Sequence, residues 1–142
     1  MTMKTTLRLP RRALGLGVAL SFAVLGGAQA ADLKLSGANE VPPVQTMATG
    51  SGAISVAADG VVSGSVKTTG ITGMAAHIHT GAAGMNGPVL IPLVKGADGE
   101  WSVPPGAKLT GEQMTRFKAG ELYVNVHSAA HEGGEIRAQL TP

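Results

Sequence analysis

The sequence contains no cysteine. Disulfide bonds are therefore excluded as supports of the fold, and a domain of this kind must be held by its apolar core, with or without help from a bound metal. Aromatic residues are scarce at 3% of the 142 residues, and charged residues make up only 14%. The apolar fraction of 44% is nevertheless too high for a disordered chain. Length and composition together predict one folded domain.

The small excess of positive charge, a formal net charge of +2, is confined to the start of the chain. Lys4, Arg8, Arg11 and Arg12 all lie there, whereas the residues after Ala30 carry seven basic and nine acidic side chains. A domain with net negative charge lacks the basic footprint of nucleic-acid-binding proteins. We therefore expect no nucleic-acid partner.

Residues 1–30 have the features of a secretory signal peptide. The basic patch precedes an uncharged apolar run over residues 13–27, and Ala28-Gln29-Ala30 supplies the small-x-small pattern that signal peptidase cleaves. A run of about fifteen residues is shorter than the roughly twenty that span a bilayer. The sequence predicts cleavage after Ala30, no membrane segment in the mature domain of residues 31–142, and a periplasmic or secreted location. Arg11-Arg12 leaves both the general and the twin-arginine export routes open.

The mature chain has the pattern of an all-β protein. From Leu33 onward, short runs of alternating apolar and polar residues are separated by Gly, Pro and Asp-Gly turns at roughly ten-residue intervals. Asp59-Gly60 and Asp98-Gly99 suit tight hairpin turns. Thr110 and Gln113 form a capping-box pattern that predicts one short helix over residues 111–118. We expect an antiparallel β-sandwich or Greek-key barrel with this single helix.

All four histidines fall in two short stretches, His77-Ile78-His79 and His127 followed by His131. In a strand, residues i and i+2 point to the same face, so His77 and His79 project together. In the later strand, His127 shares its face with Tyr123 and Asn125. If the two strands are neighbours, three imidazoles converge on the outside of the sandwich.

Imidazole nitrogens without thiolates favour Cu(II) or Zn(II). The sequence therefore predicts a site for copper, with zinc as the alternative, whose ligands are His77, His79 and His127, with His131 as a fourth ligand from a loop. The competing interpretation is structural: His77 and His79 are solvated surface residues, and His127 is bonded to a neighbouring carbonyl.

Four motifs in order give the sequence a resemblance to a known family. They are Gly37-Ala38-Asn39-Glu40-Val41-Pro42-Pro43, Ala76-His77-Ile78-His79-Thr80-Gly81 running to Gly87-Pro88-Val89, Tyr123-Val124-Asn125-Val126-His127-Ser128 and Gly134-Glu135-Ile136-Arg137-Ala138-Gln139-Leu140. Over residues 32–141 the chain resembles the CHRD domain, the module named for chordin, although Ala138 stands where the family commonly has glycine. The resemblance implies an exported interaction module.

Within this resemblance, the motif positions Glu40, Glu135 and Arg137 match the family's charged positions. We expect Glu135 and Arg137 to face the same way on the last strand and to orient neighbouring loops through hydrogen bonds or a salt bridge. His77, His79 and His127 match the family's histidines.

The expected sandwich is immunoglobulin-like or similar to that of Cu,Zn superoxide dismutase, which holds copper outside its barrel with a His-x-His pair. The present chain lacks that enzyme's cysteine pair and zinc loop, so the architectural likeness argues against a complete dismutase site and leaves a copper-only redox site open. The sequence predicts binding, in copper handling, ahead of superoxide-type redox catalysis. The alternatives are a metal-free module for an extracytoplasmic protein or glycan partner, and a metal that only stabilises the fold.

Overall fold

The computed structural model describes residue 2 and residues 29–142 of the chain. The predicted signal peptide therefore lies outside the described residues, apart from residue 2 and from Gln29 and Ala30, which begin the first strand. Cleavage after Ala30 stays a prediction.

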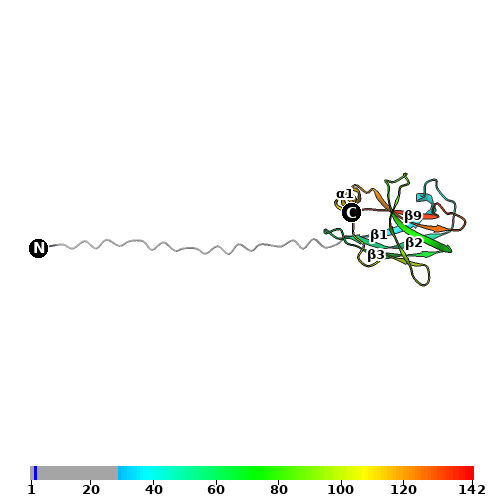
Figure 1. The fold of residues 1–142 in the computed structure, drawn as a ribbon, viewed down its shortest axis with the longest axis horizontal. Helices are drawn as coiled ribbons and strands as arrows, with labels where there is room; N and C mark the ends of the chain where they lie inside the picture. Colours follow the sequence, from blue (N-terminus) through cyan, green and yellow to red (C-terminus); the bar gives the residue numbers. More distant parts are fainter. Residues whose placement is uncertain (1, 3–28) are drawn as a thin grey trace.

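One nine-stranded sheet, in the order β5-β4-β8-β9-β1-β2-β3-β7-β6, makes up the described domain. Its strands are β1 (Gln29–Ser36), β2 (Thr49–Val56), β3 (Val62–Thr69), β4 (Gly73–Thr80), β5 (Val89–Pro92), β6 (Val94–Lys95), β7 (Glu100–Ser102), β8 (Leu122–Ser128) and β9 (Ile136–Leu140). All pairings are antiparallel, and the two edge strands are separated in the chain only by Leu93. The sheet therefore curls into a nearly closed barrel (Figure 1), and the expectation of an all-β fold is confirmed.

The two Asp-Gly pairs form the hairpin turns that the sequence predicts. Gly60 has a φ of 88° in the turn between β2 and β3, and Asp98 and Gly99 have φ of 51° and 77° between β6 and β7. Positive φ is favourable for glycine and tolerated by aspartate, so these pairs reverse the chain at little cost.

The short helix is also confirmed, as α1 (Gly111–Lys118) with a complete capping box between Thr110 and Gln113. Its Phe117 is buried in the core. In Figure 1 the helix lies at the end of the barrel where the chain terminates, in agreement with the pairing of Leu122 and Leu140.

The interior of the barrel follows the alternation of the strands. Apolar residues such as Leu33, Ile54, Val66 and Val124 point inward, and each is at most 4% exposed. On strands β4, β8 and β9, however, the opposite face is not simply solvated, because the segments 37–48 and 81–88 lie over it. Beneath and beside them lies a polar layer formed by His77, His79, Tyr123, Asn125, His127, Arg137 and Gln139.

Candidate metal centre

Strands β4 and β8 are hydrogen-bonded neighbours, which is the condition for the predicted convergence of histidines. Their register places Ala75 opposite His127, His77 opposite Asn125 and His79 opposite Tyr123. One ligand atom from each of His77, His79 and His127 lies within 4.8 Å of the others. Three imidazole nitrogens therefore form one close group on a single face of the sheet.

The structure does not place the fourth predicted ligand in this group. His131 lies in the turn between β8 and β9, where its backbone N–H donates to the carbonyl of Ser128. The group of mutually close ligand atoms in the described part of the chain contains the other three histidines. Ligation by His131 stays a prediction.

The hydrogen bonds of the rings determine which nitrogen is available. The Nδ1 atom of His79 lies 3.0 Å from the carbonyl oxygen of Gly87, and the Nδ1 atom of His127 lies 2.8 Å from that of Glu132. A carbonyl only accepts, so both Nδ1 atoms carry hydrogen and both Nε2 atoms of the neutral rings keep a lone pair. Backbone anchoring of this kind is the usual outer support of metal-binding histidines.

The third ring, that of His77, is hydrogen-bonded to His127 when no metal is bound. Nδ1 of His77 lies 3.0 Å from Nε2 of His127. Because Nε2 of His127 is an acceptor in the neutral ring, Nδ1 of His77 must donate to it, and Nε2 of His77 is left with a lone pair. An ion held by Nε2 of His127 would replace this hydrogen bond.

His79 is enclosed rather than solvated. It is 7% exposed, its Nε2 atom has no partner, and its ring stacks on Tyr123 with an interplanar angle of 1° and centroids 4.7 Å apart. The guanidinium carbon of Arg137 lies 3.4 Å from the centroid of the same tyrosine ring. The interpretation of His79 as a solvated surface residue is therefore wrong, whereas the carbonyl bond expected for His127 is present.

Burial shifts the titration of the two β4 histidines in the direction that favours ligation. Burial lowers the pKa of His77, and the nearby rings of His127 and His79 lower it further. Burial also lowers the pKa of His79, although the bond to Gly87 works against this shift. Since a metal binds only the neutral ring, these shifts extend the pH range in which the two histidines are ready to ligate.

The same shifts predict how the stability of the metal-free protein depends on pH. The unfolded chain takes up protons at these histidines near 6.5, whereas the folded state resists them, so the free energy of unfolding should fall as pH drops below about 6.5. Urea unfolding with a chelator between pH 8 and 5 checks this. The fall should be smaller in His77→Gln; an equal fall in both proteins would contradict the prediction.

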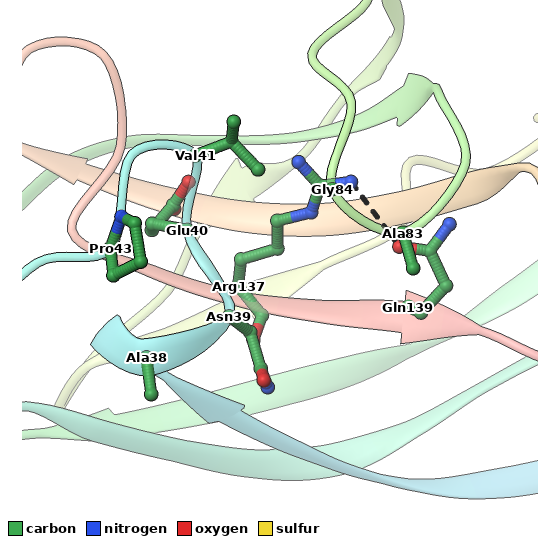
Figure 2. A pocket seen from close by; sticks show the side chains of 9 residues that line it. All are labelled: Ala38, Asn39, Glu40, Val41, Pro43, Ala83, Gly84, Arg137 and Gln139. Atoms are coloured by element: carbon green, nitrogen blue, oxygen red, sulfur yellow. Dashed lines mark hydrogen bonds between the residues drawn. The ribbon is translucent and has the colours of Figure 1, made fainter.

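Arg137 orients a loop, as the sequence predicts. Its guanidinium donates to the carbonyls of Ala82 and Met85 at 3.0 and 2.9 Å and to the side-chain oxygen of Asn86 at 3.3 Å. Figure 2 shows the guanidinium lying between the segments that carry Val41 and Gly84, at the side of a cavity of about 440 Å³. Arg137 thereby holds the segment 81–88 over the polar layer.

Glu135 also ties loops together, but separately from Arg137. It lies at the bend directly before β9 and accepts hydrogen bonds from the hydroxyls of Thr46 and Ser128. Burial raises the pKa of Glu135, but these two hydrogen bonds lower it, and the net result is a pKa below the usual value. The ion pairs of the described residues are formed by Arg116, so the expected loop contacts of Glu135 are hydrogen bonds rather than a salt bridge to Arg137.

Sequence reasoning missed two residues that support the site, because they contact the histidine rings through the backbone and not through side chains. Gly87 and Glu132 support the rings through backbone carbonyls, for which a sequence carries no side-chain signal. Asn125 is different: its place beside His127 on one strand face follows from alternation, and only its burial could not be foreseen.

Within the described residues, no helix combines the length and the apolar character that crossing a membrane requires. No curated protein and no solved structure shows a significant match to the chain. The family profile of the CHRD domain matches residues 32–140, which includes every strand from β2 to β9, most of β1 and all the histidines. This chain therefore belongs to the CHRD domain family.

Proposed function

We propose that this domain is an extracytoplasmic metal-binding module that holds one copper ion, with zinc as the alternative, through His77, His79 and His127. The observation that carries the proposal is the convergence of the three rings, whose ligand atoms lie within 4.8 Å of one another. The predicted signal peptide supports a periplasmic or secreted location.

The donor set fits these metals. Three imidazole nitrogens in a chain without cysteine suit Cu(II) and Zn(II) rather than Cu(I) thiolate or iron–sulfur chemistry. The buried Nε2 atom of His79 has no partner, and an unsatisfied buried acceptor costs about 1–3 kcal/mol. A bound ion would remove that cost. The donor type and the unpartnered nitrogen both support a metal at these three histidines.

The role that this site supports best is copper handling, meaning reversible binding of the ion outside the cytoplasm. Bound copper would supply one-electron redox chemistry, and superoxide-type turnover requires an open coordination position. The protein's own residues position the ligand rings: the carbonyls of Gly87 and Glu132 orient His79 and His127, and Tyr123 packs against His79.

The test is elemental analysis of the protein expressed from the full-length chain, recovered from the exported fraction without a tag or chelator. We expect near-stoichiometric copper or zinc in the wild type and none in His77→Ala/His127→Ala, because one remaining imidazole cannot hold the ion tightly. Isothermal titration with each metal should show an affinity loss of at least about 100-fold in the variant.

His131→Ala is the matched control, since it removes a histidine that lies outside the close group. Retention of metal by this control, with loss from the double variant, supports the three-histidine site. Equal metal content in wild type and double variant, or no uptake of added copper or zinc by either, would overturn the proposal in favour of a metal-free interaction module.

A further inference from the structure

Buried polar atoms without partners are concentrated at one place in the described domain. The described domain has four such side-chain atoms. Three of them lie in and beside the histidine group: His79 Nε2, Asn125 Oδ1 and Glu40 Oε1. The fourth, Nε1 of Trp101, lies elsewhere, on β7. Buried polar groups are normally satisfied, and an unsatisfied one points to a missing water or ion. The metal proposed above accounts for His79 but not for Asn125.

Asn125 lies at the centre of the histidine group. It faces His77 across the β4–β8 ladder and stands two residues before His127 on the same strand face. It also faces Arg137 across the β8–β9 ladder, and it is only 2% exposed. Asn125 thus has His77 on one side and Arg137 on the other. Its amide is therefore in direct reach of the proposed ion.

The two ends of the Asn125 amide differ in what surrounds them. The Nδ2 atom and the Oε1 atom of Glu40 each lie 2.5 Å from the point that a Cβ on Gly134 would occupy, so the amide nitrogen and the carboxylate approach the same glycine. The Oδ1 atom, at the other end of the amide, is buried and has no hydrogen-bond partner.

Two buried acceptors without partners therefore stand on the same face of the neighbouring strands β4 and β8: Oδ1 of Asn125, and Nε2 of His79, whose ring hydrogen is engaged by Gly87. Two acceptors cannot satisfy each other, whereas one cation satisfies both. Resting on the proposed function, we propose that Oδ1 of Asn125 is the oxygen ligand that completes the three-histidine site. The site is then an N₃O set with the four ligands that zinc usually takes.

Zinc titration of wild type, Asn125→Leu, Asn125→Asp and Gln45→Leu tests this assignment. Leucine at 125 removes the oxygen, and we expect the affinity for zinc to fall at least about 10-fold, whereas aspartate keeps an oxygen ligand and should bind at least as tightly as wild type. Gln45→Leu removes an exposed side-chain amide and should bind within about 3-fold of wild type. Wild-type affinity in Asn125→Leu would overturn the assignment.

A crystal structure of the wild-type protein with zinc decides the question even if Asn125→Leu fails to fold. We expect an Oδ1–zinc distance of about 2.0–2.2 Å. An ion held by the three histidines with a water between it and Asn125 would overturn this inference and leave the proposed function standing. No ion at the histidines, despite excess zinc, would overturn the proposed function itself.

Discussion

Replacement of Arg137 by methionine is expected to lower the free energy of unfolding by about 2–6 kcal/mol. Arg137 is 1% exposed, so the carbonyls of Ala82 and Met85 that it satisfies lie in a buried environment and would lose their donors. Methionine fills much of the same volume but donates no hydrogen bond. Urea unfolding in the presence of a chelator measures the effect on the metal-free protein.

Loss of this charge also acts on Glu40. Burial raises the pKa of that carboxyl and the positive charge of Arg137 lowers it, so the variant should show a higher Glu40 pKa as well as lower stability. The carboxyl resonance of Glu40, followed by NMR as pH is varied, reports the change.

Arg116→Met is the matched control. Arg116 pairs with Glu112 at 3.5 Å and with Glu121 at 3.3 Å, but its side chain is 44% exposed. Surface ion pairs contribute at most about 1 kcal/mol, so this variant should unfold almost like wild type. Similar losses of stability in the two variants would contradict the prediction, because the buried contacts of Arg137 would then stabilise the fold no more than the surface ion pairs of Arg116.

Replacement of Gly87 by alanine is expected to destabilise the fold by about 1–3 kcal/mol and to weaken metal binding about 10- to 100-fold. A Cβ at this position would clash with the backbone oxygen of Thr80, so the segment must move. The carbonyl of Gly87 anchors His79, and its N–H donates to the hydroxyl of Tyr123. A shifted Gly87 would therefore release the most buried of the proposed ligands.

Gly111→Ala serves as the control, since a Cβ on this first residue of α1 would meet no atom within 4 Å. It should leave metal affinity unchanged, and it should leave stability unchanged or raise it slightly. Thermal melts and zinc titrations of the three proteins check both effects. Unaltered zinc affinity in Gly87→Ala, in a variant that is nevertheless less stable, would show that the carbonyl anchor does not orient His79.

The charged motif residues show how far a sequence pattern reaches. Their type and spacing indicated a loop-orienting role for Arg137, and that role is confirmed. The pattern did not indicate that Glu40 would be 4% exposed without an ion pair, because its burial is produced by segments 37–48 and 81–88 folding over the sheet. Nor did it separate the partners of Glu135 from those of Arg137, since the bend before β9 breaks the alternation on which the expectation rested.

Local rules of chain conformation determined most of the fold from the sequence alone. The two-residue period of strands, the positive φ of Asp-Gly turns and the capping box of α1 each act over a few neighbouring residues, and so does the shared direction of His77 and His79. Only the tertiary structure decided that β4 lies beside β8, which brings His127 to a pair fifty residues earlier in the chain. The register of distant strands and the closing of loops depend on how the whole core packs, and for that reason the enclosed site around Asn125 emerged only from the folded domain.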